Sequence, residues 1–433
     1  MIGLWQKLEQ LENESNPIMV SIVGARQMGR GLVSQISSMK GMRPAIVAAP
    51  TLENAKAAFT LAGYIENKHF AVAEDIDGAQ RLIDSGKFAA TSNISLAMDS
   101  PWIQCIVDAT GNPEAGAAIA GDAIANKKHI VMLNVEADAC FGHILHQKAQ
   151  KAGVVYTGSA GDEPGAIMEL YSLARALGYE IKALGKGKNN PVDYDCTPYS
   201  VEREANARGI NPSKLCSFKD GTNTAVELTS LANATGFLPD IPGCHGITST
   251  LSELPDKLSL KSEGRGGILA RYGIVEYVNG LAPGVFAVIS TDKPQCAHQL
   301  SYLYMGKGPN FCLFRPFHLC SMETPISIAL ACIYNQPTIA PLFGSVSDAC
   351  AVAKTDLKSG THLDGIGGFT IRGAILSSAD AKAQNALPIG LINQNTRLIR
   401  DAKKGQLLTY DDLVLDESSP AVILRREQDA VRE

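Results

Sequence analysis

A glycine-containing turn near the N-terminus has the residue types that bind the phosphates of a dinucleotide. The apolar run Ile18–Val23 leads into Gly24, and Gly29 follows at the start of a helical pattern. In the G-x-G-x-x-G fingerprint the first glycine makes the tight turn and the third lets the helix pack on the strand. Arg26 replaces the middle glycine, which lets the backbone approach the pyrophosphate. Arg26 therefore either holds a phosphate or fills the groove of a vestigial site.

The kind of cofactor is indicated by the residues after the second predicted strand. Residues 48–51 (Ala-Ala-Pro-Thr) contain no acid, whereas an NAD-specific protein usually places Asp or Glu there for the ribose 2′-hydroxyl. The missing carboxylate favours NADP, with NAD as the alternative, and the guanidinium of Arg26 suits the 2′-phosphate or the pyrophosphate. The predicted cofactor-binding residues are Gly24, Arg26, Gln27, Met28, Gly29, Thr110, Gly111 and Asn134.

Two adjacent acids follow the last predicted strand of this region. Asp162 and Glu163 lie in a turn between a glycine and a proline. Such carboxylates can act in catalysis by binding Mg²⁺ or Mn²⁺, which prefer oxygen ligands and would polarise a substrate carbonyl. They can equally cap the helix predicted over 167–177, because negative charge is favourable at a helix N-terminus. Both interpretations stay open.

A basic segment follows the strand predicted over 180–184. Lys186 and Lys188 flank a glycine, and Asn189 comes next. Two ammonium groups and an amide in a loop suit an anionic substrate, either a phosphate or a carboxylate. We predict catalytic roles for the two lysines and substrate binding for Asn189, with a solvated surface loop as the alternative.

Further basic residues are predicted to bind the same substrate. Lys307 lies in a glycine-rich turn, and with Arg315 and His318 it is expected to form a second cluster. His318 has aromatic and aliphatic neighbours, so it is either a catalytic or a core histidine. His245, among small residues, is a candidate proton donor in contact with the substrate.

The elements that must position these residues alternate between strand and helix. Strands are predicted at 18–23, 45–49, 103–109, 129–134 and 154–157, and helices at 28–39, 53–62, 76–85, 113–125 and 139–152. Continuously apolar strands that alternate with helices indicate a parallel sheet covered on both faces. Residues 1–160 are therefore predicted to form a Rossmann-like dinucleotide-binding domain of an α/β protein.

The rest of the chain has a different amino-acid composition. Glycine, proline and polar residues become more frequent after residue 160, which indicates an α+β substrate domain over 161–345. Short apolar pieces between glycine- and lysine-containing turns then predict a small β-rich module over 346–433.

Composition excludes several classes of protein. The 433 residues are 45% hydrophobic, carry a net charge of −5 and contain no basic run, so a nucleic-acid surface is not expected. Apolar runs fall short of the roughly 18 residues that span a membrane, and the N-terminus lacks a signal-peptide pattern. The ten cysteines form no C-x-x-C pair and are interpreted as reduced thiols. We expect a cytoplasmic protein and, as the commonest closed assembly, a homodimer.

Several motifs resemble those of one family. The chain resembles the 1-deoxy-D-xylulose 5-phosphate reductoisomerase-like enzymes, whose nucleotide domain is homoserine-dehydrogenase-like. The segment from about residue 348 resembles a SAF domain. The motifs that carry these resemblances lie at residues 131–138, 161–164, 185–191, 232–236, 305–309, 315–318, 353–360 and 402–405.

The resemblance implies NADP(H) and conversion of 1-deoxyxylulose 5-phosphate to methylerythritol 4-phosphate in isoprenoid synthesis. Similar proteins act as oxidoisomerases on branched sugar acids in carbohydrate metabolism. The leading hypothesis is thus an NAD(P)-dependent oxidoreductase that acts on a small anionic sugar or sugar phosphate. The alternative is a non-redox lyase, isomerase or ligand-binding protein. Arg26 departs from the family's glycine loop, which puts hydride transfer in question more than the fold.

Overall fold

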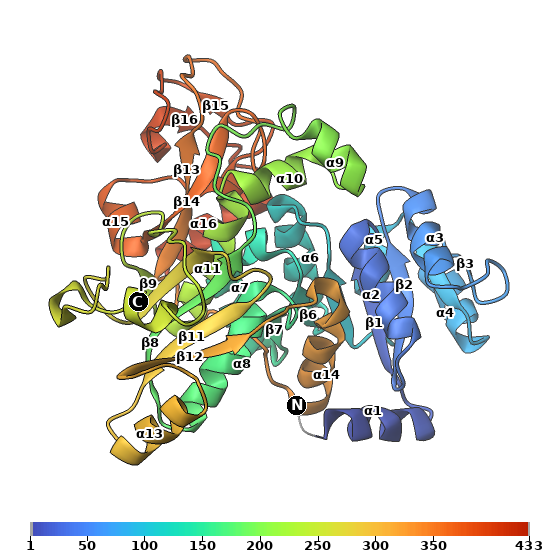
Figure 1. The fold of residues 1–433 in the computed structure, drawn as a ribbon. Coiled ribbons are helices and arrows are strands. Elements are labelled where there is room, and N and C mark those ends of the chain that lie inside the picture. The colour runs from blue at the N-terminus through green and yellow to red at the C-terminus, as the bar shows by residue number, and fades with distance from the viewer. Residues whose placement is uncertain (1–2, 432–433) are drawn as a thin grey trace. The chain divides into compact units, whose positions relative to one another are not determined.

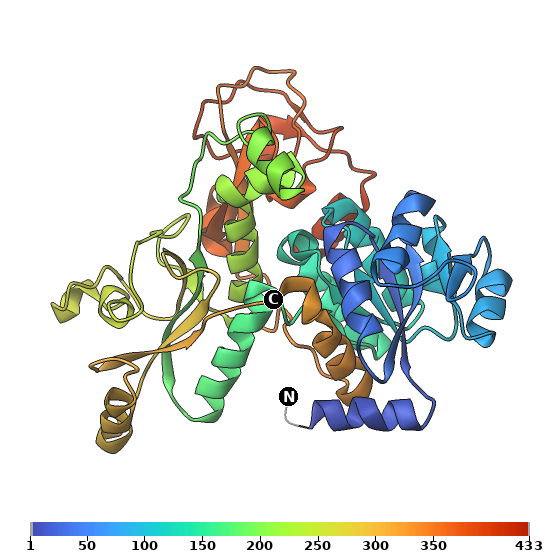
Figure 2. The same ribbon diagram turned by 45° about the vertical axis from the view of Figure 1, so that its right-hand side comes forward.

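The computed structural model describes residues 3–431 and divides the chain into two compact units. The nucleotide unit comprises the chain up to Asp162 together with Leu319–Ala340, and the second unit comprises Glu163–His318 and the chain from Pro341 onward. Figures 1 and 2 show the elements of both. The chain first crosses between the units after Asp162, and its return to the nucleotide unit over residues 319–340 was not predicted. The division into three domains stays a prediction.

The nucleotide unit contains a seven-stranded parallel sheet of order β3-β4-β2-β1-β5-β6-β7. The strands are β1 (Ile18–Val23), β2 (Met42–Ala48), β3 (Phe70–Val72), β4 (Phe88–Thr91), β5 (Cys105–Asp108), β6 (His129–Met132) and β7 (Tyr156–Gly158). Apart from the additional edge strand β3, this is the strand order of a dinucleotide-binding fold. The prediction of an α/β protein with a Rossmann-like sheet is confirmed.

Helices cover both faces of this sheet, since α2 contacts α3 and α14 while α6 contacts α5 and α7. The helices are α1 (Leu4–Asn13), α2 (Gln27–Ser37), α3 (Leu52–Leu61), α4 (Ile76–Asp84), α5 (Ile94–Asp99), α6 (Pro113–Ala125), α7 (Val135–Ala152), the short η2 (Cys320–Met322) and α14 (Thr324–Tyr334). Val20 and Ile22 of β1 share one core with Ile328 and Ala329 of α14. The returning segment therefore completes the core of the nucleotide unit.

The second unit is built on a five-stranded mixed sheet of order β12-β11-β8-β10-β9. The strands are β8 (Glu180–Lys188), β9 (Leu238–Pro239), β10 (Ile274–Asn279), β11 (Val285–Ser290) and β12 (Asn310–Arg315). Figure 2 shows the long helices α8 (Glu163–Ala176) and α11 (Thr222–Thr235) beside this sheet; α8 contacts β8, β11 and β12, and α11 contacts α8 and β10. These two helices and β8 supply the side chains discussed below.

The C-terminal region of the second unit has short strands, and α11 packs on β13 and β14. Its elements are β13 (Ser347–Ala353), β14 (Ile371–Ser377), α15 (Ser378–Ala383), η3 (Ile389–Leu391), β15 (Arg397–Leu398), η4 (Tyr410–Asp412), β16 (Leu413–Val414) and α16 (Pro420–Ala430). The remaining elements are α9 (Glu202–Arg208), α10 (Pro212–Lys219), α12 (Leu254–Lys257), η1 (Lys261–Glu263) and α13 (Pro294–Tyr302). Within residues 3–431, no helix combines the length and apolar character needed to cross a lipid bilayer.

Candidate active site

The turn after β1 has the backbone geometry that the glycines predict. Gly24 has a φ of 103°, and a Cβ there would lie 2.6 Å from the carbonyl oxygen of Ala109. A Cβ on Gly29 would lie 1.8 Å from the carbonyl oxygen of Gly24. Any side chain at these two positions would displace backbone, so both glycines are required by the turn. The turn lies where β1 and β5 are neighbours, the point at which α/β sheets bind ligands.

The start of α2 can accept an anion. Arg26 is the N-cap residue in an extended conformation, and within the described chain its side chain makes no capping hydrogen bond to the first turn. Arg26 and Gln27 are exposed, and Met28 is half-buried. Because the first N–H groups of a helix have no intrahelical acceptor, this terminus suits a pyrophosphate. Together with the glycine turn, these residues fit a dinucleotide.

A buried polar network shapes the loop after β5. The Asp108 carboxylate accepts hydrogen bonds from the Thr110 hydroxyl (2.6 Å) and from Asn134 Nδ2 (2.8 Å), and Asn134 also donates to the Asn112 carbonyl oxygen (2.7 Å). Burial raises the pKa of Asp108 to about 6, while the hydrogen bonds from Thr110 and Asn134 oppose the rise. Gly111 lies inside this loop with a φ of 62°. Asn134 fixes the loop, and its predicted contact with the cofactor stays a prediction.

Lys186 and Lys188 lie on a buried strand, so the prediction of a surface loop was wrong. Strand β8 runs through Lys188, and both lysines are buried. The glycines beside these lysines, Gly185 and Gly187, were interpreted as loop residues, but they allow the backbones of neighbouring segments to pack closely. A Cβ on Gly185 would lie 2.0 Å from the Glu276 carbonyl oxygen, and one on Gly187 would lie 2.2 Å from the Leu281 carbonyl carbon.

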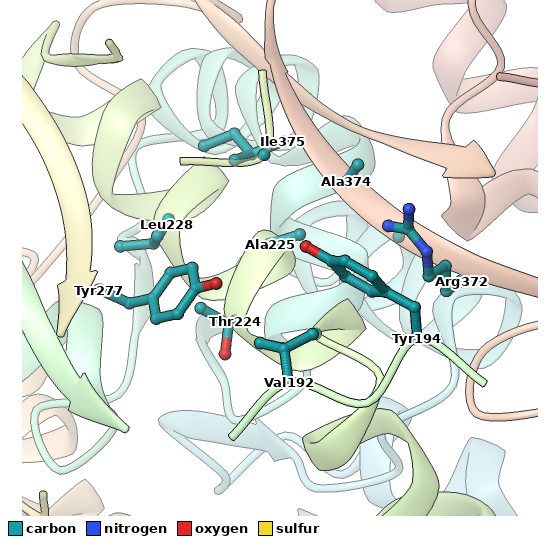
Figure 3. Close-up of a pocket in the computed structure, with 12 residues that line it drawn as sticks. Val192, Tyr194, Thr224, Ala225, Leu228, Tyr277, Arg372, Ala374 and Ile375 are labelled. Atoms are coloured by element: carbon teal, nitrogen blue, oxygen red, sulfur yellow. The ribbon is translucent and has the colours of Figure 1, made fainter. Parts of the chain in front are cut away.

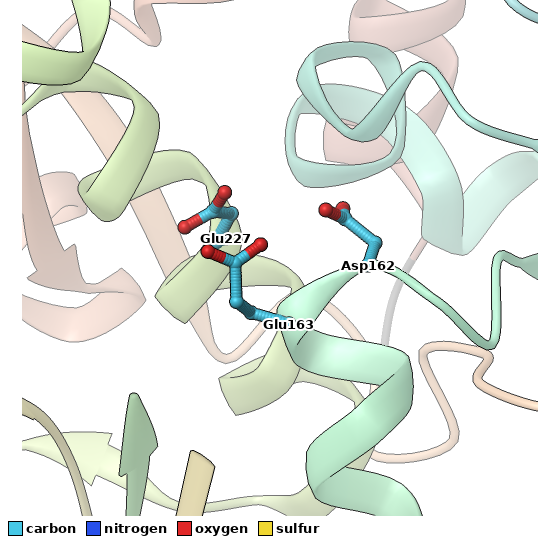
Figure 4. Close-up of side chains that lie close together, drawn as sticks. All are labelled: Asp162, Glu163 and Glu227. Carbon is cyan, nitrogen blue, oxygen red and sulfur yellow. The ribbon is translucent and has the colours of Figure 1, made fainter. Parts of the chain in front are cut away.

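The central feature of the second unit is a buried ion cluster around Lys186. Its Nζ lies 2.6 Å from Glu163 Oε1 at the start of α8 and also contacts Glu227 of α11. The side chains of Lys186, Glu163 and Glu227 are 7%, 14% and 4% exposed. Asn223 donates to Glu227, and His318 Nε2 lies 3.4 Å from Glu163 Oε1. Figure 4 shows the Glu163 and Glu227 carboxylates facing each other.

This environment shifts the pKa values of its members. Burial opposes charge on Lys186, but Glu163 and Glu227 outweigh it and raise the pKa of the ammonium. Burial and the charge of Glu163 raise the pKa of Glu227 to about 7, against the influence of Lys186. Burial and Lys186 lower the pKa of Lys188 to about 8, and its Nζ donates to the Phe218 carbonyl oxygen at 2.6 Å. With a pKa of about 8, Lys188 can exchange its proton close to neutral pH, as acid–base catalysis requires.

One of the two predicted metal ligands, Glu163, forms an ion pair with Lys186. Asp162 ends the nucleotide unit, and Glu163 opens α8, where its charge is favourable at the helix N-terminus. Lys186 places its ammonium between Glu163 and Glu227, in the position that a cation bound to both carboxylates would take. The residues therefore do not fit a divalent ion there while Lys186 is charged. A metal at Asp162 and Glu163 stays a prediction.

One of the predicted basic residues, His318, lies next to the ion cluster. Arg315 Nη1 lies 3.2 Å from Glu169 of α8, and its guanidinium stacks at 4.7 Å on Phe317. His318 is 13% exposed and pairs with Glu163. Lys307 is exposed in the turn before β12, whereas Arg315 ends that six-residue strand. Lys307 and Arg315 therefore lie towards opposite ends of a strand that spans roughly 17 Å, and their predicted joint contact with a substrate stays a prediction.

The other predicted substrate residues have different surroundings. Asn189 is exposed directly after β8, and its side-chain oxygen accepts a hydrogen bond from Asn190. His245 Nε2 lies 2.8 Å from Asp240 Oδ2, and Asp240 borders an open pocket of about 660 Å³. His245 thus belongs to a separate pair, and its contact with substrate stays a prediction.

Glu227 and Asn223 were missed by the sequence analysis. They are four residues apart on α11, and every residue of this helix is buried, so no hydrophobic face distinguishes them. The available signal was an acid and an amide with i, i+4 spacing, which places both on one side of a helix of small residues.

A small cavity lies elsewhere around α11. Figure 3 shows Tyr194, Tyr277 and Arg372 around it, and the Arg372 guanidinium stacks 3.8 Å from the Tyr194 ring. Its volume of about 20 Å³ holds a water molecule, whereas sites for small organic ligands have about 300 Å³ or more. This cavity is therefore too small for a sugar.

Comparisons with known proteins support an oxidoreductase. Residues 161–324, less than half of the chain, match the family model described as oxidoreductase DRL, catalytic domain. This segment contains Glu163, Lys186, Lys188, Glu227 and His318. A search of curated protein sequences found no match.

Solved structures with similar folds include dehydrogenases. A probable dehydrogenase from Thermotoga maritima is 9% identical, with a TM-score of 0.42 over 74% of this chain and 90% of that one. GenD2 from gentamicin A biosynthesis, in complex with NAD, is 13% identical, with a TM-score of 0.37 over 75% and 89% of the two chains. At TM-scores below 0.5 these likenesses bear on neither substrate nor mechanism.

Proposed function

We propose that the protein is an NADP-dependent oxidoreductase that acts on a small anionic sugar derivative. The observation that carries the proposal is the buried Lys186 cluster with Lys188 beside it, within the segment that matches an oxidoreductase catalytic domain. The glycine turn after β1 supports the cofactor, because it has the shape that accepts a pyrophosphate. NAD is the alternative cofactor.

Lys188 is the proposed proton donor and acceptor. A nicotinamide held at the glycine turn would supply or accept the hydride. During reduction of a carbonyl the ammonium of Lys188 gives its proton to the substrate oxygen, and during oxidation the neutral amine takes it back. A pKa of about 8 suits both directions, since efficient acid–base groups titrate near the working pH.

Lys186 and its ion-pair partners are proposed to position a positive charge near the substrate oxygen. Lys186 remains protonated between two carboxylates, so it presents a fixed positive charge where negative charge develops on the substrate oxygen. Glu163, Glu227 and Asn223 keep the ammonium in place. His318, beside Glu163, and Arg315, beside Glu169 further along α8, are proposed to bind the anionic group of the substrate.

We further propose that this oxidoreductase is a reductoisomerase. Conversion of 1-deoxy-D-xylulose 5-phosphate to 2-C-methyl-D-erythritol 4-phosphate, or oxidoisomerisation of a branched sugar acid, combines a carbon-skeleton rearrangement with hydride transfer. Both reactions need a group that moves a proton at an oxygen and a cation that stabilises an oxyanion. These are the roles proposed for Lys188 and Lys186.

The test measures NADPH oxidation at 340 nm with 1-deoxyxylulose 5-phosphate, and NADP⁺ reduction with branched sugar acids. We expect turnover with one of the two classes and at least a hundredfold loss in Lys188→Met. Saturable sugar-acid binding without cofactor binding would instead support a non-redox protein. Light scattering of the same sample tests the proposed homodimer.

A further inference from the structure

An arginine is fixed between the turns that follow β1 and β2. Arg30, in the first turn of α2, donates from Nε to the Ala25 carbonyl oxygen at 3.0 Å and from Nη2 to Asn54 Oδ1 at 2.9 Å. Asn54 in turn donates to Thr51 Oγ1 at 2.7 Å. Thr51 is the N-cap residue of α3. The guanidinium is half-buried and held by two acceptors on different turns.

Arg30 contacts the first turn of α3, close to the carboxyl end of β2, where a dinucleotide-binding sheet would hold the adenosine ribose. The ribose 2′ position of the cofactor lies at the carboxyl end of the second strand. In this protein β2 ends at Ala48 and residues 48–51 carry no acid; the first acid after the strand is Glu53, exposed in the first turn of α3. Thr51 is exposed at the same turn.

We propose that Arg30, with Thr51 and Asn54, forms the site that binds the 2′-phosphate of NADP. A guanidinium has five N–H donors, and the bonds to Ala25 and Asn54 use two of them. The remaining donors suit phosphate oxygens, which pair with the planar fork of arginine. Asn54 is a positioning residue, because it links the guanidinium to α3.

Arg26, the residue that the sequence first suggested, has a different place. It is exposed at the N-cap of α2, directly after the glycine turn, where a pyrophosphate binds. Arg30 lies one helical turn further on, about 6 Å along the axis, and contacts α3. Arg26 is therefore assigned to the pyrophosphate, which NAD and NADP share. Arg30 is assigned to the 2′-phosphate, which only NADP carries.

The inference rests on the proposed function, and nucleotide fragments test it without catalysis. Calorimetry of the full-length protein compares 2′,5′-ADP with 5′-AMP, which differ by the 2′-phosphate alone. We expect 2′,5′-ADP to bind at least tenfold more tightly. Arg30→Ala should reduce this ratio to about one without changing the affinity for 5′-AMP, and Arg30→Lys should leave an intermediate ratio.

Two further variants sharpen the test. Arg26→Ala is the matched control, and it should change the affinities for NADPH and NADH by the same factor, so that their ratio is unchanged. Asn54→Ala should lower the ratio even if Arg30→Ala does not fold. An unchanged ratio in Arg30→Ala and Asn54→Ala, or a ratio that falls in Arg26→Ala, overturns the assignment to Arg30. If the unmodified protein binds NADH more tightly than NADPH, the 2′-phosphate site is also overturned, but the proposal that the protein is an oxidoreductase survives. Absence of binding of either dinucleotide overturns the proposed function as well.

Discussion

Lys186 and Lys188 lie two residues apart on β8, yet replacement by methionine should destabilise the protein at Lys186 and not at Lys188. Removal of Lys186 leaves Glu163 and Glu227 facing each other in a buried site, with side chains 14% and 4% exposed. Removing one partner of a buried ion pair costs about 3–5 kcal/mol, because the remaining carboxylates must either stay charged without their partner or take up a proton on Glu227, whose pKa Lys186 lowers. We expect a loss of this size for Lys186→Met at pH 7.

Lys188 differs because its charge is unfavourable in the folded state. A pKa lowered from 10.5 to about 8 corresponds to about 3 kcal/mol, at about 1.36 kcal/mol per pH unit. This cost is fully present below pH 8 and disappears as the pH rises to 10.5, where the unfolded chain also loses the proton. Lys188→Met removes the cost but leaves the Phe218 carbonyl oxygen without its donor, which costs about 1–3 kcal/mol. The net expectation at pH 7 is no change or a gain of up to about 2 kcal/mol.

Differential scanning calorimetry is the suitable assay. Tryptophan fluorescence would not report on β8, because both tryptophans, Trp5 and Trp102, lie in the nucleotide unit. Lys182→Met is the matched control on the same strand. Its partner Glu180 is 66% exposed, so the pair should contribute less than about 1 kcal/mol, and the contact of the Lys182 ammonium with the Tyr272 ring at 4.2 Å about 0.5–2 kcal/mol. The reasoning is refuted if Lys186→Met costs no more than this control, or if Lys188→Met is as destabilising as Lys186→Met.

Three further predictions concern catalysis and cofactor binding. The kcat/KM for carbonyl reduction, followed by NADPH absorbance, should fall as the pH rises through about 8, because the ammonium of Lys188 loses its proton; a profile unchanged in Lys188→Met would contradict this role. Treatment with EDTA should leave the activity intact, because the ammonium of Lys186 occupies the place of a metal ion. Electron paramagnetic resonance should detect Mn²⁺ binding to Lys186→Ala but not to the unmodified protein. If the unmodified enzyme depends on Mn²⁺, the ammonium of Lys186 does not exclude the metal. Gly116→Ala places a Cβ 2.6 Å from Asn134 Nδ2 and 2.9 Å from Asp108 Oδ2, so it should weaken cofactor binding about tenfold in calorimetry, and unaltered affinity would separate this network from the cofactor.

The nucleotide unit was largely predictable because its signals are local. Strand β1 and helix α6 have the predicted bounds, since a buried parallel strand is a continuous apolar run and α6 starts with Asn112 and Pro113. The elements β3, β4 and α5 were not predicted. They are three, four and six residues long, too short for a periodic pattern.

The ion cluster could be predicted only in part, because its members come from distant segments. Lys186 was identified as a candidate, but the glycines beside it suggested a loop, and only the packing of neighbouring strands explains them. Glu163 gave no sign of its partner, since Glu227 is 64 positions further along the chain on a helix without an exposed face. Pairings of this kind are decided by topology, which residue types and spacing do not encode locally.

The route of the chain has a consequence for its synthesis. The polypeptide crosses between the two units three times, after residues 162, 318 and 340, and Ile328 and Ala329 complete a core that begins with Leu4 and Leu8. A ribosome must therefore produce the whole five-stranded sheet of the second unit before the helix that finishes the first unit emerges. The first 162 residues alone should expose apolar surface and depend on chaperones. An exchange of nucleotide units between related enzymes must transfer both pieces, because a single junction would separate α14 from its sheet.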